Sequence, residues 1–145
     1  MATMYESIQR VLRGELPAPP VARLIGFRLL SARPGEAVVE LDADERHTNP
    51  MGTLHGGVLC DIADAAMGIA YACALAEGET FTTLEMKINF LKPVWKARLR
   101  AVGRVVKQGR TIGLVECDVT DDKQGLVARA SSTCMTLRGA QAQGR

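Results

Sequence analysis

The sequence is poor in aromatic residues and carries little net charge. Only six of its 145 residues are Phe, Tyr or Trp, and the formal net charge at pH 7 is +2. No stretch interleaves basic with aromatic side chains, so a surface on which nucleic-acid bases could stack is absent. A net charge this small gives no electrostatic argument for binding a polyanion either. The composition therefore predicts no nucleic-acid partner.

Residues that ligate metals are also scarce. The four cysteines are widely spaced without a CxxC pair, and the only histidines are His47 and His55. Since metal sites are built from closely spaced nitrogen and sulfur ligands, we expect neither a metal nor a redox cofactor. Unpaired, widely spaced cysteines are typical of reduced thiols in a cytoplasmic protein.

The chain lacks targeting and membrane signals. Its first ten residues have no apolar core of the kind found in signal peptides. Residues 58–76 are apolar over a span that could cross a bilayer, but they include Asp61 and Asp64. Each aspartate would cost roughly 2.5–3.5 kcal/mol at a membrane centre. We therefore expect a cytoplasmic protein without a membrane partner, in which this segment is the central helix of one domain.

The hydrophobic pattern changes along the chain from helical to strand-like. Helical spacing predicts a short amphipathic helix near the N-terminus, and later segments alternate apolar with polar residues, which is typical of half-buried strands. The predicted elements are a helix over 4–13, a hairpin of 27–32 and 36–41, the helix from about 57 to 76, and strands over 84–90, 95–104, 111–119 and 126–137.

This order predicts an α+β fold. A helix that is apolar nearly all round must be covered on more than one side, and a curved antiparallel sheet would cover it. We divide the chain into a helical, proline-rich lead-in over 1–21, a domain over 22–138 and a flexible tail over 139–145.

The most informative segment, Asn49 to Gly57, leads directly into the long apolar helix. Its glycines precede the helix start, where free N–H groups and the helix dipole favour negative charge. The helix carries only two charges, Asp61 and Asp64, and a carboxylate in such a helix needs a partner or a task. This combination predicts a site that holds a carbonyl oxygen near a carboxylate.

These residues resemble the hot-dog-fold acyl-CoA thioesterases, in the PaaI-like branch related to the phenylacetyl-CoA and 4-hydroxybenzoyl-CoA thioesterases. The resemblance rests on Asn49, on the triplet His55-Gly56-Gly57, and on Asp64 nine residues after the histidine. It extends over roughly residues 22–137, including the segments Asn89-Phe90-Leu91-Lys92-Pro93 and Lys107-Gln108-Gly109-Arg110.

The resemblance implies a curved antiparallel sheet wrapped around one central helix, and an enzyme that hydrolyses acyl-CoA to a free acid and coenzyme A. It also implies a homodimer, often paired into a homotetramer, with the sites at the dimer interface. One subunit would provide Gly56, whose N–H polarises the thioester carbonyl, and its neighbour would provide Asp64. Asp64 would act as nucleophile or as general base, and both possibilities remain open.

Other residues are candidates for supporting roles, each with a structural alternative. Asn49 could position water or the thioester oxygen, or form an Asx turn. His55 could orient the acyl group or hold its loop. Thr83 could hold the lytic water, with Thr82 as a substitute. Strand alternation places the Thr83 side chain on the face away from Leu84, Met86 and Ile88, which could be the dimer face or solvent. Asp61 is expected to be a charge favoured by the helix dipole.

The remaining candidates concern substrate binding. Gly57 is expected to permit close helix packing, and an acyl pocket would be walled by Leu54, Leu59 and Met67, together with Ile62. Residues 86–110 hold eight Lys or Arg and no Asp or Glu, which predicts a basic rim for the coenzyme A phosphates. The best candidates for this rim are Lys92, Lys107 and Arg110, because they lie near turns. The alternating Lys96, Arg98 and Arg100 fit a solvated strand face equally well.

Two other functions remain open. A hot-dog hydratase or dehydratase would act on the acyl thioester without hydrolysing it, although the helix lacks the histidine that such enzymes often use. A non-catalytic acyl-CoA-binding module would tolerate the loss of Asp64. The acyl group could be an aryl or a medium-length aliphatic chain.

Overall fold

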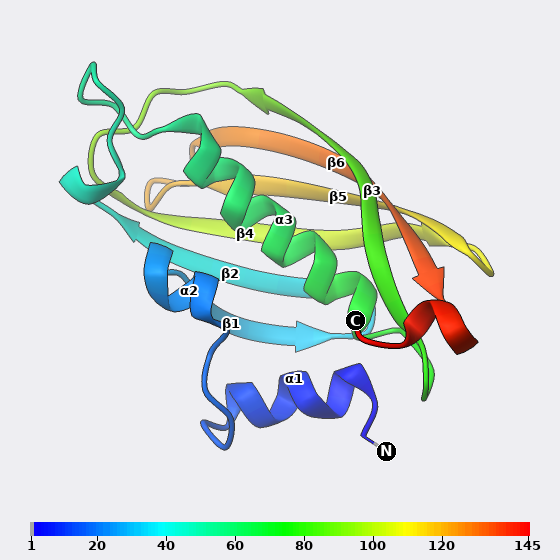
Figure 1. The fold of residues 1–145 in the computed structure, drawn as a ribbon. Coiled ribbons are helices and arrows are strands. Elements are labelled where there is room, and N and C mark those ends of the chain that lie inside the picture. Colours follow the sequence, from blue (N-terminus) through cyan, green and yellow to red (C-terminus); the bar gives the residue numbers. More distant parts are fainter. Residues whose placement is uncertain (1) are drawn as a thin grey trace.

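The computed structural model describes residues 2–145, and a single long helix, α3, lies against one curved sheet (Figure 1). The helices are α1 (Met4–Leu12), α2 (Pro20–Ile25) and α3 (Gly56–Ala72). The strands are β1 (Arg28–Arg33), β2 (Glu36–Ala43), β3 (Thr80–Phe90), β4 (Ala97–Gln108), β5 (Ile112–Thr120) and β6 (Leu126–Leu137). Short 3-10 turns cover Glu45–His47 and Gly139–Ala142.

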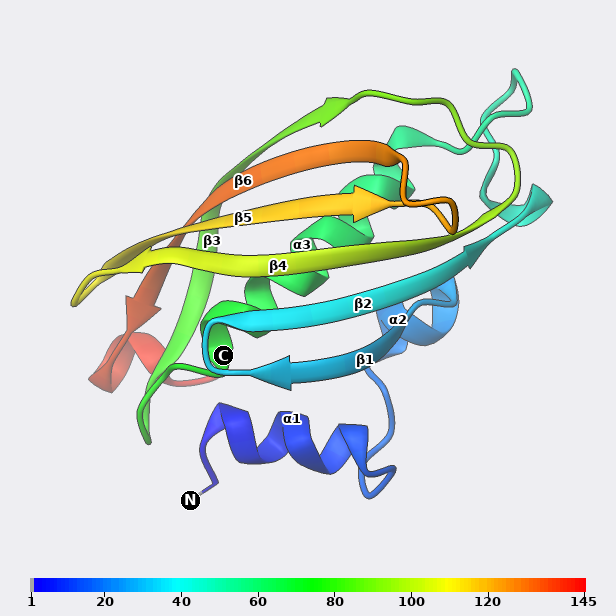
Figure 2. The same cartoon turned by 180° about the vertical axis from the view of Figure 1, so that it is seen from behind.

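The sheet is antiparallel throughout and has the strand order β1-β2-β4-β5-β6-β3. Its edges are therefore β1 and β3, and the sheet curves so that both edges flank α3 (Figures 1 and 2). The predicted α+β architecture, with a hairpin, one long helix and four further strands, is confirmed. The division of the chain at residues 21 and 138 stays a prediction.

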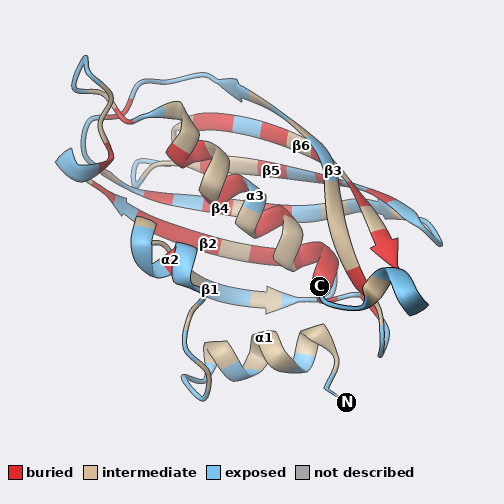
Figure 3. Ribbon diagram, viewed as in Figure 1, coloured by how far each residue is buried: buried red, intermediate tan, exposed pale blue. Residues whose placement is uncertain are grey.

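The core lies between α3 and the concave face of the sheet. One side of α3 is buried there, as the red segments in Figure 3 show, while Asp64 and Gly68 lie on the side that the sheet leaves uncovered. Gly103 of β4 permits the closest approach, because a Cβ atom at this position would lie 2.5 Å from the carbonyl carbon and oxygen of Ala66. Within residues 2–145 no helix is long and apolar enough to cross a bilayer.

The N-terminal helix α1 packs beside β1 rather than in the core. A capping box between Thr3 and Glu6 starts it, which satisfies two backbone N–H groups that would otherwise have no partner. The second helix, α2, was not predicted. It begins at Pro20, a position that proline favours, and ends at Gly26, whose φ of +96° is left-handed.

A β-bulge in β3 overturns one prediction. The register with β6 shifts between Thr83 and Glu85, so the side-chain alternation breaks there. Leu84 is 51% exposed, whereas Met86 and Ile88 pack against the core. The prediction that Thr83 faces away from the apolar side of the strand is therefore wrong.

The convex face of the sheet carries ion pairs that cross neighbouring strands. Glu40 of β2 accepts hydrogen bonds from Arg28 of β1 and from Arg100 of β4, and Asp42 pairs with Arg98 at 2.9 Å. Burial alone would raise the pKa of Glu40, but the bonds from the two arginines outweigh it and hold the pKa below its usual value. Arg98 and Arg100 thus belong to an outer-face network.

Candidate active site

The loop before α3 is shaped by Asn49. Its side-chain oxygen accepts from the N–H groups of Met51 and Thr53, at 2.9 and 3.2 Å, and its amide nitrogen donates to the Thr53 hydroxyl at 2.8 Å. These bonds form an Asx turn, which fixes the path by which the chain enters α3. In one protomer Asn49 is thus a loop-forming residue, and a role at the thioester stays a prediction.

Gly56 is the first residue of α3, and its N–H points out of the helix start. The preceding residue, His55, makes no side-chain capping bond, and within residues 2–145 the Gly56 N–H has no hydrogen-bond acceptor. An uncapped helix start of this kind presents N–H donors and positive dipole charge to a ligand. The donor is therefore available to a carbonyl oxygen.

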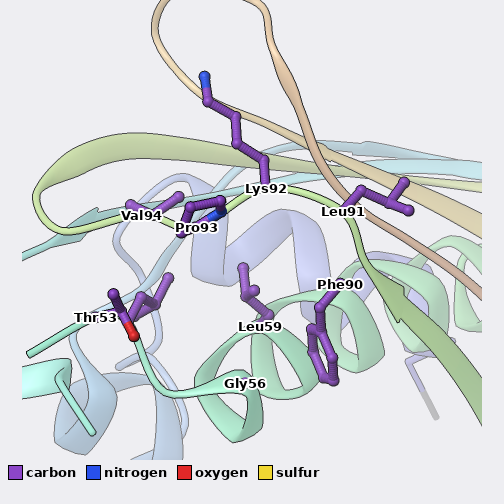
Figure 4. Close-up of a pocket in the computed structure, with 9 residues that line it drawn as sticks. Thr53, Gly56, Leu59, Phe90, Leu91, Lys92, Pro93 and Val94 are labelled. Carbon is purple, nitrogen blue, oxygen red and sulfur yellow. The ribbon is translucent and has the colours of Figure 1, made fainter. Parts of the chain in front are cut away.

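A cavity of about 410 Å³ opens at this helix start (Figure 4). Leu54 and Leu59 line it, in agreement with the predicted pocket wall, and so does Gly56. Phe90 covers the glycine closely, since a Cβ atom on Gly56 would lie 2.9 Å from the Phe90 Cζ atom. Gly56 thus keeps the backbone accessible beside an aromatic ring.

Lys92 stands at the rim of the same cavity, next to Pro93 (Figure 4). Its ammonium group pairs with Asp121 at 2.5 Å, and the lysine side chain is 44% exposed. The charge is thus held in place and remains accessible to solvent, which suits contact with a phosphate group.

His55 packs over the first turn of α3. A Cβ atom on Gly57 would lie 2.8 Å from the His55 Nε2 atom, so Gly57 makes room for the imidazole ring. Burial raises the pKa of Asp61, and the nearby imidazole of His55 partly offsets that rise. The other histidine, His47, is buried, and its Nε2 lies 2.7 Å from the Ile25 carbonyl oxygen, which is a structural contact.

Asp64 lines a second, larger cavity of about 600 Å³, whose walls are almost wholly apolar, and within one chain the residue is exposed to solvent. Within the described chain its carboxyl group has no hydrogen bond or ion pair. Desolvation by the surrounding protein raises its pKa, and the neighbouring charge of Asp61 raises the pKa further. An unpaired carboxylate with a raised pKa inside an apolar cavity is a candidate for proton transfer or nucleophilic attack.

Thr83 lines the same cavity as Asp64. Its hydroxyl group lies 3.8 Å from the Cys134 sulfur, a weak contact that leaves the hydroxyl available for a stronger partner. The β-bulge that turns Leu84 outward is what brings Thr83 to this side. The structure therefore brings together two of the predicted residues, Asp64 and Thr83.

The two halves of the predicted site are separated within one protomer. Gly56 and Asp64 lie eight residues apart on α3, which is ~12 Å along the axis at about 1.5 Å per residue. They also line different cavities. One thioester group cannot touch both in the same chain, so any reaction that uses both needs a second copy.

Four predicted binding residues line neither cavity: Gly57, which packs against the His55 ring, and Met67, Lys107 and Arg110. Met67 is fully buried against the sheet and accepts from the Ser132 hydroxyl at 3.5 Å, so it is a core residue. Lys107 and Arg110 flank the β4–β5 turn, beside the C-terminal end of α3, where a Cβ atom on Gly113 would meet the Tyr71 ring. Gly56 begins the opposite end of that helix.

Sequence reasoning predicted α1 as a helix but missed its place in the wall of the Asp64 cavity, and it missed the aromatic residues of the site. Phe90 covers Gly56, while Phe81 lies against Gly68 and lines the Asp64 cavity. The pairing of a β3 aromatic with a glycine on α3 could have indicated these contacts. Among residues 2–145 no group of three or more His, Cys, Asp or Glu side chains could hold a metal ion.

Comparison with known proteins agrees with this geometry. Human acyl-coenzyme A thioesterase 13 is 30% identical over 136 residues, covering 92% of this chain and 96% of the relative. The acyl-coenzyme A thioesterase PaaI of Escherichia coli K12 is 31% identical over 108 residues, covering 74% of this chain and 75% of the relative. A solved structure of a phenylacetic acid degradation-related protein from Ralstonia eutropha JMP134 superposes with a TM-score of 0.80 at 31% identity, covering 88% of this chain and 97% of the other.

An antiparallel sheet wrapped around one long helix is the hot-dog fold, and the curated relatives are thioester hydrolases. Residues 51–128, more than half of the sequence, match the Thioesterase superfamily, and the chain belongs to that family. The alternative of a hydratase or dehydratase finds no support in these comparisons.

Proposed function

We propose that this protein hydrolyses acyl-CoA thioesters at a site shared by two protomers. The relatives named above act on acyl-coenzyme A, and the present chain has an N–H donor and a carboxylate of the required kinds. Gly56 of one protomer would polarise the thioester carbonyl, and Asp64 of a second protomer would complete the site. The single observation that carries the proposal is the unpaired Asp64 carboxylate in its apolar cavity.

The chemistry follows from these two groups. As general base, Asp64 takes a proton from water while the water oxygen bonds to the carbonyl carbon. The negative charge that develops on the carbonyl oxygen is stabilised by the Gly56 N–H, a contribution of about 2.7–4 kcal/mol for one such donor. The carbon–sulfur bond then breaks, and the coenzyme A thiolate takes up the proton. As nucleophile, Asp64 would instead bond to the carbonyl carbon and displace the coenzyme A thiolate, giving an anhydride that water then opens to the free acid and the Asp64 carboxylate.

Supporting roles follow from where the other residues lie. Thr83 shares the Asp64 cavity and can position the water, while Asn49 and His55 shape the helix start that carries Gly56. Lys92, in the wall of the Gly56 cavity, would contact the coenzyme A phosphates. Lys107 and Arg110 could join that rim only from the second protomer, because in their own protomer they lie beside the opposite end of α3 from Gly56. The acyl group would be aryl or of medium length.

Replacing Asp64 tests the proposal most directly. We expect Asp64→Asn to lower kcat by ~10²–10⁴-fold, the range that a general base contributes, measured as thiol release from a panel of acyl-CoAs. Asp61→Asn is the matched control, since it removes a carboxylate one turn away that lines neither cavity, and its kcat should change little. Unchanged turnover in Asp64→Asn would leave only a binding function, and products formed without thiol release would indicate a hydratase.

A single turnover in ¹⁸O-labelled water separates the two roles of Asp64. If it acts as base, the acid released in the first turnover carries the label, because the new oxygen comes from water. If it acts as nucleophile and water opens the anhydride at the Asp64 carbonyl carbon, the first product takes an unlabelled oxygen from the Asp64 carboxylate and the label enters Asp64, so an unlabelled first product demonstrates the nucleophilic role.

A further inference from the structure

The Asp64 cavity has a wall that the thioesterase chemistry does not explain. Its outer side is formed by α1, whose residues Met4, Ile8 and Val11 line it, and by the segment that joins α1 to α2. The opposite side is α3, with the small residues Ala65 and Gly68. In Figure 1, α1 runs beside β1 at the edge of the sheet, clear of the core.

The lining of the cavity suits a ligand that is apolar along its length and reactive at one end. Of the residues that line it, only Arg28, Asp64 and Thr83 are polar. The Arg28 guanidinium group is turned to Glu40 and Asp42 on the convex face, so its charge does not enter the cavity. The interior thus offers a hydroxyl-bearing ligand no hydrogen-bond partner except the two predicted catalytic side chains.

The dimensions fit a straight acyl chain. Along α3 the cavity extends from Asp64 to Ala72, eight residues or ~12 Å. Because three backbone bonds of an extended chain advance ~3.3–3.6 Å, this length takes roughly ten carbon atoms. The volume of about 600 Å³ is ample, since a cavity of ~150 Å³ holds benzene.

The helix α1 is held loosely enough to adapt. None of its residues is fully buried, and within residues 2–145 its one hydrogen bond to the sheet runs from the Gln9 amide to the Ala32 carbonyl oxygen, at 2.9 Å. Residues 13–20, which lead from α1 into α2, contain Gly14, at a φ of +75°, and three prolines, so α1 is attached to the domain through an irregular segment.

We infer that the inward face of α1, with Ile8 at its centre, forms the outer wall of the acyl compartment and sets the length of a saturated straight-chain acyl group at about ten carbons. This inference rests on the proposed function, since it assigns the substrate class of the same site. An acyl chain attached to the carbonyl beside Asp64 lies between α1 and α3.

The test compares acyl-CoAs that differ only in chain length: butanoyl-, octanoyl-, decanoyl- and dodecanoyl-CoA, with phenylacetyl-CoA as the aryl member. We expect Ile8→Trp, which fills the compartment, to lower the kcat/KM ratio of decanoyl-CoA to butanoyl-CoA by ~60-fold. That figure takes about three excluded methylene groups at roughly fourfold each. Ile8→Ala should move the preference toward dodecanoyl-CoA.

Arg10→Trp is the matched control, because Arg10 places equal bulk on the exposed side of α1 and lines no part of the cavity. Its chain-length profile should equal that of the wild type. An unchanged profile in both Ile8 variants, a wild-type preference for phenylacetyl-CoA, or a change of oligomeric state in light scattering without a change of profile would overturn the inference. If the wild type cleaves no acyl-CoA in the panel, the proposed function itself fails.

Discussion

Two acidic side chains of this molecule, Glu40 and Asp64, lie in opposite surroundings. Glu40 is buried on the convex face of the sheet between Arg28 and Arg100, and its pKa is lowered. Asp64 opens into an apolar cavity on the other side of the molecule without a partner, and its pKa is raised. A paired carboxylate contributes to stability, whereas an unpaired one costs stability and persists where it has chemical work to perform.

The basic side chains also differ in their surroundings. Most arginines of β4 are neutralised across strands by Glu36, Glu40 and Asp42. Lys92 is tied to Asp121 yet stands at the rim of the Gly56 cavity. Arg98, Arg100 and Arg104 therefore belong to the convex-face ion pairs, and a phosphate-binding role for Lys92 stays a prediction.

Apart from the Asp64 substitution, the largest expected effect comes from removing the N–H donor of Gly56. Gly56→Pro deletes this N–H at the first helical position, which proline tolerates, and His55 already has the extended conformation that precedes proline. We expect kcat to fall by ~10²–10³-fold relative to Gly56→Ala, which keeps the N–H and adds the same Cβ beside Phe90. Steady-state kinetics of the two variants gives the ratio.

Co-expression of Gly56→Pro with Asp64→Asn sharpens that result. In a two-fold dimer with sites shared between protomers, random pairing gives one intact site in each mixed dimer, so about a quarter of wild-type activity should return. No recovery, despite mixed dimers shown by mass spectrometry, would mean that both groups act within one chain.

A smaller effect is expected on the convex face. Glu40→Gln leaves Arg28 and Arg100 without their shared carboxylate, which should lower the free energy of unfolding by ~1–3 kcal/mol. The value of kcat should remain within about twofold of the wild type, since no cavity includes Glu40. Urea denaturation measures the first quantity. A large fall in kcat with unchanged stability would reverse the contrast between the two carboxylates.

The smallest effect is a pH dependence of opposite sign at the two carboxylates. The raised pKa of Asp64 means that its charge destabilises the folded state at neutral pH, so Asp64→Asn should raise the Tm at pH 7. That gain should vanish as pH falls below the unfolded pKa near 3.9, where both states are protonated. The lowered pKa of Glu40 contributes stability above its unfolded pKa, which is lost as pH falls through the folded value.

Thermal melts of wild type and both variants between pH 3 and pH 8 check these signs. Activity should likewise fall as Asp64 is protonated, with a midpoint above that of an ordinary aspartate, and Asp61→Asn should lower this midpoint because it removes the second cause of the shift. An Asp64→Asn protein less stable than wild type at pH 7 would show that the carboxylate has a stabilising partner.

The sequence predicted the order of the elements because long, strongly periodic segments leave little ambiguity. β6 has its predicted bounds, 126–137, and α3 starts one residue from its expected position. It could not predict the bulge at Leu84, since a single extra residue leaves no mark in an alternating pattern, nor α2, which is six residues long and preceded by prolines.

For the candidate site, the sequence indicated which residues line cavities better than it indicated where those cavities lie in the fold. Gly56, Leu54, Leu59 and Lys92 line one cavity, and Asp64 and Thr83 line another. Met67 lies in the core because the sheet covers the side of α3 that carries it, and hydrophobicity alone does not say which side that is. A site shared between chains would be a property of assembly, which the pattern of one sequence does not display, and the predicted roles of Asn49 and His55 depend on it as well.

The close approach at Gly103 has a consequence for how this enzyme can change. A single methyl group there would meet the backbone of α3 at Ala66, two residues after Asp64, and force the helix off the sheet. Both Gly56 and Asp64 travel with that helix, so a substitution that touches no ligand would disturb donor and carboxylate together. Mutational paths toward new substrates are therefore free to reshape α1 and the cavity walls, while this position in β4 has to remain fixed.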